Sequence, residues 1–64
     1  MRAYKVIDVF NNKTHEIKNI IPQIGSTVIF EDDQNIFRYK VMDINYTFFE
    51  ETGEFDCVIF VRKD

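Results

Sequence analysis

The 64-residue sequence has few of the residues on which small secreted, metal-binding and catalytic domains depend. It contains one Cys, one His and no Trp. A single cysteine excludes an intramolecular disulfide, and small secreted domains usually carry several, so we expect a cytoplasmic protein. One His and one Cys far apart in the chain are too few ligands for a zinc site. The sequence therefore predicts no metal and no cofactor.

Glycine, proline and long apolar runs are also scarce. Two Gly and one Pro, without any low-complexity tract, argue against disorder. No run approaches the 18 or so apolar residues of a membrane span, and residues 1–8 lack the apolar core of a signal peptide. With 45% hydrophobic residues, the length suits one small domain over 1–64 and excludes a two-domain enzyme.

Basic residues are outnumbered, with eight Lys and Arg against eleven Asp and Glu and a net charge of −3. Proteins that bind nucleic acid usually show the opposite balance, because much of their affinity comes from neutralising phosphates. The composition argues against a general affinity for nucleic acid, although it allows a local basic patch.

What the chain does contain is a series of short apolar and β-branched segments separated by turn residues. Asn11-Asn12-Lys13, Gly25 and Gly53 mark turns in which positive φ is tolerated. This pattern predicts an all-β domain. The expected strands cover residues 2–10, 14–21, 27–31, 36–49 and 54–62.

The segment 14–21 has two interpretations. Its isoleucines, continued by Ile24, recur at helical spacing, and Thr14 could cap a short helix. Pro22 would then fall inside the helix and cost about 3 kcal/mol, so we favour a strand. The choice between strand and short helix remains open from sequence alone.

The segment 36–49 changes phase. Phe37, Tyr39 and Val41 alternate on one face, whereas the later apolar residues, from Ile44 to Phe48, follow the opposite parity. A bulge near Met42 would return both halves to the same core and bend the strand sharply. The sequence thus predicts a single small five-stranded barrel or a highly bent antiparallel sheet.

The stretch Ile21-Pro22-Gln23-Ile24-Gly25-Ser26-Thr27-Val28-Ile29 resembles the P-x-x-G-x-x-V entry to a strand in SH3-like small barrels. The run Tyr39-Lys40-Val41-Met42-Asp43-Ile44-Asn45-Tyr46 is similar to the strand that follows in many of them. Small phage and prophage proteins often have this layout. The resemblance implies an SH3-like fold and assigns no functional residues. The groove Trp of peptide-binding SH3 domains is missing.

We find no constellation of residues for catalysis. His15 has no visible partner and follows a turn, so we expect a strand-edge or loop residue. Cys57 alternates with apolar neighbours and is expected to be a buried small hydrophobe. No nucleophile with an activating base is apparent. We therefore expect no enzyme and no small-molecule substrate.

Several strands are apolar on both faces, which is more than one small core can hide. Exposed apolar patches commonly mark interfaces, so we expect Phe49, Val58 and Phe60 to bind a partner protein or a second copy in a homodimer. The acidic turns would form a rim around this patch, unless they are simply solvated tips. A phage-encoded module that acts on a host protein would fit this description. The expected rim consists of Glu31, Asp32, Asp33, Glu50 and Glu51.

An alternative function is nucleic-acid binding by a small barrel. Four cations near the middle and the end of the chain would contact the phosphates: Arg38, Lys40, Arg62 and Lys63. The aromatic residues that alternate with Arg38 and Lys40 would face the core, so stacking of bases is not expected there.

Overall fold

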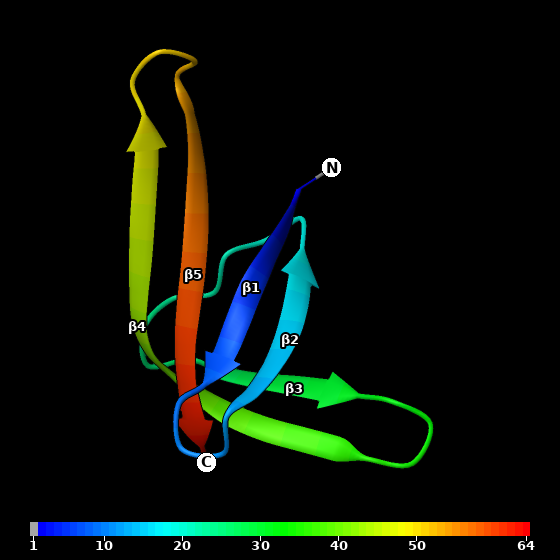
Figure 1. The fold of residues 1–64 in the computed structure, drawn as a ribbon. Helices are drawn as coiled ribbons and strands as arrows, with labels where there is room; N and C mark the ends of the chain where they lie inside the picture. Colours follow the sequence, from blue (N-terminus) through cyan, green and yellow to red (C-terminus); the bar gives the residue numbers. More distant parts are fainter. Residues whose placement is uncertain (1) are drawn as a thin grey trace.

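The computed structural model describes residues 2–64, and Met1, the first residue of the expected domain, lies outside the described residues. These residues form one five-stranded sheet and no helix, so the all-β prediction is confirmed (Figure 1). The strands are β1 (Ala3–Asp8), β2 (Lys13–Lys18), β3 (Thr27–Glu31), β4 (Ile36–Phe49) and β5 (Glu54–Lys63).

The strand order is β2-β1-β5-β4-β3. Antiparallel ladders join β1 to β2, β3 to β4 and β4 to β5. The central ladder between β1 and β5 is parallel and pairs Val6 with Ile59. It is the one pairing that the expected antiparallel sheet does not include. It brings the first and last strands together in the middle of the sheet.

A bulge in β4 bends the sheet where the sequence predicts it. Val41 pairs with Val61 and Asp43 with Phe60, so Met42 is the extra residue. An extra residue restores the alternation, so that Val41 and Ile44 both pack toward the core. The sheet is strongly curled and forms a half-barrel whose outer strands are β2 and β3 (Figure 1).

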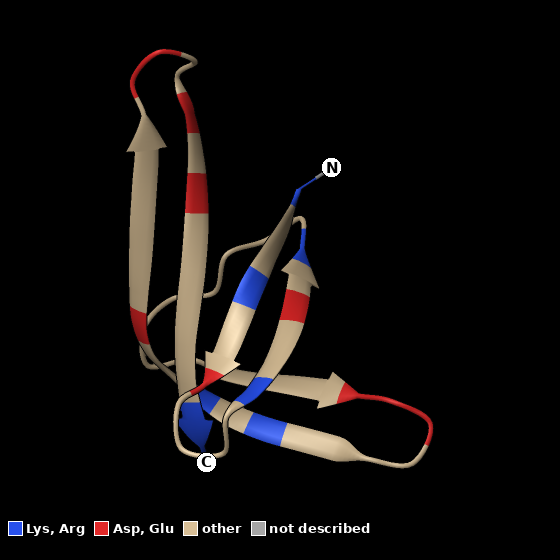
Figure 2. Ribbon diagram, viewed as in Figure 1, with Lys and Arg blue, Asp and Glu red and all other residues tan. Residues whose placement is uncertain are grey.

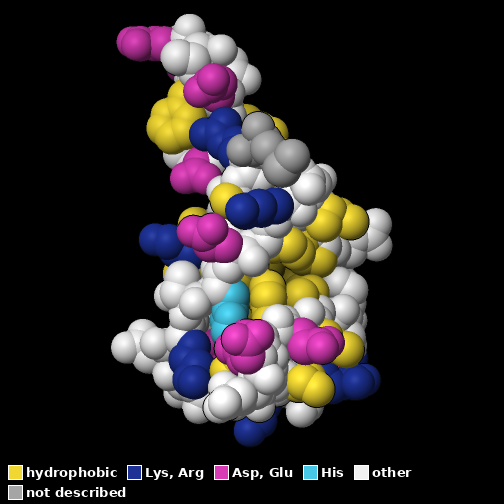
Figure 3. Space-filling view, turned by 90° about the vertical axis from the view of Figure 1, so that its right-hand side faces the viewer, with side chains coloured by type: hydrophobic (Ala, Val, Ile, Leu, Met, Phe, Trp, Pro, Cys, Tyr) yellow, Lys and Arg dark blue, Asp and Glu magenta, His cyan; other side chains and the backbone are white. Residues whose placement is uncertain are grey.

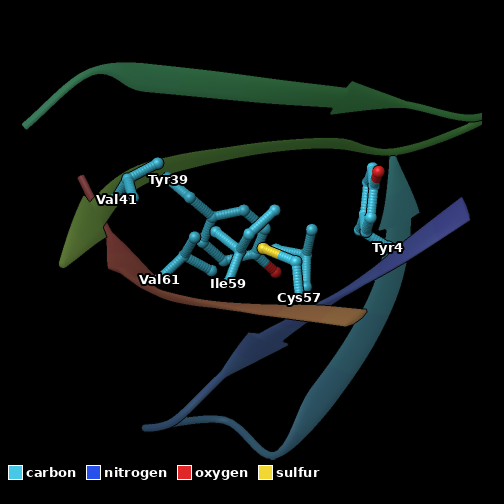
Figure 4. Packing of buried hydrophobic residues seen from close by; sticks show 7 residues of the cluster. Tyr4, Tyr39, Val41, Cys57, Ile59 and Val61 are labelled. Carbon is cyan, nitrogen blue, oxygen red and sulfur yellow. The ribbon is translucent and has the colours of Figure 1, made fainter. Parts of the chain in front are cut away.

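The core fills the concave face of this half-barrel (Figure 4). Alternate residues of β1 and β5 supply most of it, because successive side chains of a strand point to opposite faces. Cys57 is among them and is free and buried, as expected. Burying an aliphatic side chain such as Ile59 contributes about 1.5–3 kcal/mol. The buried cluster consists of Tyr4, Val6, Tyr39, Val41, Cys57, Ile59 and Val61.

The segment 14–21 begins as a strand, and the helical interpretation is wrong. β2 pairs with β1 throughout, from Ala3 opposite Lys18 to Asp8 opposite Lys13. Asn19 then takes a φ of 71°, which ends the strand before Pro22. The isoleucines at helical spacing do not share one face, because Ile17 and Ile21 pack on the core while Ile20 is 64% exposed. Pairing with β1 satisfies a backbone that an eight-residue helix would satisfy poorly.

The open side of the half-barrel is bridged by side chains. The His15 ring on β2 stacks on Phe30 of β3, with ring centroids 4.6 Å apart. His15 Nε2 and the Tyr39 hydroxyl are hydrogen-bonded at 3.0 Å. His15 is half-buried on an outer strand, where it joins the two edges of the curled sheet.

Candidate functional site

The most distinctive surface is a hairpin that projects beyond the rest of the sheet (Figure 1). β3 pairs with β4 only as far as Lys40, and β1 pairs with β5 only from Val58 onward. Residues 46–57 therefore pair only with one another, and both edges of this hairpin are open in the described chain. We call residues 46–57 the arm. It makes the molecule 41 Å long against 22 and 20 Å in the other directions.

The inner face of the arm, on the same side as the core, carries three aromatic rings. Tyr46 and Phe48 lie 6.1 Å apart, and Phe55 lies within 6.0 Å of both, measured between ring centroids. Phe48 is 70% exposed and Tyr46 is 48% exposed. Phe55 also stacks on Tyr4 of the core at 6.0 Å. The cluster is therefore an extension of the core into solvent, and we call Tyr46, Phe48 and Phe55 the aromatic face.

The charge on the arm has one sign. Residues 46–57 contain no Lys or Arg, and the acids lie at the tip and along β5 (Figure 2). The remainder of the chain holds eight Lys and Arg against seven acids. Among residues 2–64 the only ion pair joins Arg38 to Asp64, so the acids of the arm have no basic partner among these residues. The arm's acids are Glu50, Glu51, Glu54 and Asp56.

The expected patch of Phe49, Val58 and Phe60 lies on the opposite, outer face of the sheet. Val58 and Phe60 are half-buried and pair in register with Lys5 and Ile7 of β1. Phe49 is 46% exposed but pairs with Glu54 at the end of the arm. The structure thus brings two of the three residues together and places the third near the arm's tip.

The two acidic turns do not surround this patch. Glu31, Asp32 and Asp33 precede β4, whereas Glu50 and Glu51 follow it. They lie at the two ends of a 14-residue strand, far apart in Figure 2. A single acidic rim around Val58 and Phe60 is therefore not formed. The long, bent β4 holds the two acidic turns apart, and the sequence alone could not place them relative to each other.

The four cations of the alternative function do gather at one end of the molecule, around the ends of β4 and β5 (Figure 2). Lys40 pairs directly with Arg62, and Lys63 pairs with Tyr39. Arg38 and Lys63, together with Lys13, line an open hollow of about 370 Å³. We call Lys13, Arg38, Lys40, Arg62 and Lys63 the basic end.

A buried carboxylate, which the sequence analysis missed, lies beside this hollow. Asp8 is 1% exposed and accepts hydrogen bonds from the backbone N–H groups of Phe10 and Asn11 and from Asn11 Nδ2. Burial raises the pKa of Asp8, but the hydrogen bonds from Asn11, Phe10 and Tyr39 outweigh it, so the pKa lies below its ordinary value. One sequence signal for its burial was available, because Asp8 alternates in step with Tyr4 and Val6 and so points to the core side of β1.

Two further groups have perturbed pKa values. Burial, and after it the nearby Asp8 carboxylate, raises the pKa of Tyr39. Burial, with a smaller contribution from the charge of Asp56, raises the pKa of Cys57. Both shifts keep these groups neutral near neutral pH, which suits core residues better than nucleophiles.

The described residues offer no metal-binding group of three His, Cys, Asp or Glu side chains. No helix of residues 2–64 has the length and apolar character needed to cross a bilayer. Comparison of the chain with models of protein families, with curated proteins and with solved structures gives no match.

Proposed function

We propose that this protein is a small protein-interaction module and that the aromatic face of the arm is its contact surface. The observation that carries the proposal is the 70% exposure of Phe48 within a cluster of three rings on a hairpin with two open edges. Isolated two-stranded hairpins are marginally stable in water, and exposed apolar clusters commonly mark interfaces. A partner would cover the rings and stabilise the arm.

The aromatic face replaces the outer patch as the favoured surface. Val58 and Phe60 are already half covered within the sheet, so less apolar area remains there to bury. Aromatic residues are also the commonest energetic centres of interfaces. We place the module in the cytoplasm and assign it no catalytic activity. A phage-encoded protein that occupies a host protein would act in this way.

The test is site-specific photocrosslinking in cells that produce the protein. A benzophenone side chain replaces Phe48 in one variant and Phe10 in another, because these phenylalanines are matched in exposure at 70% and 71%. Phe10 lies in the turn after β1, away from the arm. We expect a discrete protein adduct from position 48 and none from position 10. Equal labelling from both positions, or none from position 48, would contradict the proposal.

A second candidate function is binding of a polyanion such as nucleic acid by the basic end. The observation in its favour is that Lys40 lies directly opposite Arg62. Like charges at such positions destabilise a sheet, and a bound phosphate would remove this cost. Titration with labelled single-stranded and duplex DNA at two salt concentrations tests it. Binding that weakens steeply with salt and is lost in Lys40→Gln/Arg62→Gln would support this function over the first.

A further inference from the structure

We infer that the partner of the aromatic face is a second copy of this chain, packed face to face and antiparallel about a twofold axis. This inference rests on the proposed function and adds the identity of the partner. In such a pair the rings of Tyr46, Phe48 and Phe55 on one arm cover the same rings on the other. A twofold interface of this kind is self-complementary and closes at two copies.

The charge distribution is the reason for choosing a second copy. The arm carries four acids and no base, whereas the rest of the chain holds all eight cations and seven acids. A parallel arrangement of two arms would bring the tips Glu50-Glu51 together and repel. An antiparallel arrangement instead carries each acidic tip down to the body of the other copy. Each copy thus carries an acidic tip and basic residues that the tip of the other copy could contact.

The body offers basic residues at the height that an antiparallel arm would reach. Arg2 precedes β1 and Lys18 ends β2, and these strand ends pair through Ala3 and Lys18. Both residues are exposed and neither forms an ion pair with a described residue. Figure 2 shows this end of the β1–β2 hairpin beside the lower part of the arm. In Figure 3 basic side chains lie below the acidic tip, with hydrophobic and further acidic side chains beside them.

The same arrangement accounts for two exposed apolar residues in the segment between β2 and β3. Ile20, just beyond Lys18, is 64% exposed, and Ile24 in the next turn is 62% exposed. A second arm lying across this region would contact them as well as the aromatic face. At about 150–250 Å² for each buried aromatic side chain, three rings bury less than the roughly 800 Å² per partner of a standard interface. We therefore expect a dimer that dissociates on dilution.

Sedimentation equilibrium of the full chain over a range from low to high micromolar concentration tests the inference. The expected result is a mass that rises from 7.7 kDa toward twice that value and stops there. Phe48→Ser should weaken the dimer at least tenfold, because aromatic residues at the centre of an interface dominate its affinity. The matched control Phe10→Ser should change it less than twofold. Circular dichroism checks that both variants remain folded.

A charge swap tests the antiparallel geometry. Glu50→Lys/Glu51→Lys should weaken self-association, and so should Arg2→Glu/Lys18→Glu. The two double variants mixed together should associate at least as well as the original chain. In the mixed pair each tip again faces residues of opposite charge on the body of the other copy. No recovery in the mixture would overturn the antiparallel arrangement.

The possible failures are distinguishable. A mass that stays at 7.7 kDa, together with a Phe48 crosslink to a different protein, would overturn the second copy as partner and leave the interaction function standing. A monomer without any Phe48 crosslink would overturn both. A mass that keeps growing beyond two copies would show head-to-tail contacts and would also overturn the closed dimer.

Discussion

The imidazole of His15 stacks on the phenyl ring of Phe30, with their planes 11° apart. The two residues come from β2 and β3, the outer strands of a sheet in which three other strands lie between them. Hydrogen-bonded ladders join neighbouring strands of the curled sheet, whereas this pair of rings joins its two edge strands through side chains alone. The contact therefore stabilises the curled shape of the half-barrel.

Replacing His15 with Ala should lower the free energy of unfolding by about 1–2 kcal/mol. The variant loses the stack on Phe30 and the hydrogen bond to Tyr39. His15→Phe, which keeps a ring, should lose less. Urea denaturation measures both, and Thr14→Ala on the exposed face of the same strand is the control. If His15→Ala and Thr14→Ala proved equally stable, the pair would not hold the edges together.

Replacing Asp8 with Ala should cost about 2 kcal/mol. Three hydrogen bonds from Phe10 and Asn11 lose their acceptor, and a buried site is left without its polar partner. Asp32 is a matched control, because it accepts two similar hydrogen bonds, from Gln34 and Asn35, in an exposed turn. Asp32→Ala should cost well under half as much. Urea denaturation of the two variants, with an equal loss in both, would contradict a special role for the buried carboxylate.

The lowered pKa of Asp8 predicts how stability depends on pH. The folded protein holds this carboxyl ionised below the ordinary value of 3.8, so it binds fewer protons than the unfolded chain. The stabilisation is complete above that value and is lost as the pH falls through the folded pKa. Unfolding measured between about pH 5 and pH 2 should show this loss. In Asp8→Asn the slope should be shallower, and an unchanged slope would assign the dependence to other groups.

Cys57 should react slowly with a thiol reagent in the folded protein. The side chain is 1% exposed, and burial and the charge of Asp56 raise its pKa, so little thiolate meets the reagent. Absorbance with a disulfide reagent at pH 8 should show a slow reaction that becomes fast in urea. A fast reaction without urea would mean that β5 opens readily near the arm.

Much of the fold follows from local patterns. Alternation and turn residues correctly delimit β3 and β4, and the phase change locates the bulge at Met42. Gly25 and Gly53 take positive φ, as their turns require. These features depend on neighbours in the chain, so the sequence carries them directly. The helical spacing around Ile17 is outweighed because pairing with β1 is a tertiary contact.

The candidate site was harder to predict from the sequence. Parity places Tyr46 and Phe48 on the core side of their strand, and the sequence therefore counts them as core. Where the core stops depends on how far β1 and β3 extend along β5 and β4. Those strands end early, so residues that alternation assigns to the interior lie in solvent instead.

The sequence alone determined an all-β chain, its five strands, the bulge and the burial of Cys57, because each depends on local periodicity and steric preference. Only the tertiary structure decided the parallel β1–β5 ladder, the His15–Phe30 contact and the exposed aromatic face. These depend on which strands meet and where their pairing ends. Such contacts join residues distant in the chain, and local pattern has no means of specifying them.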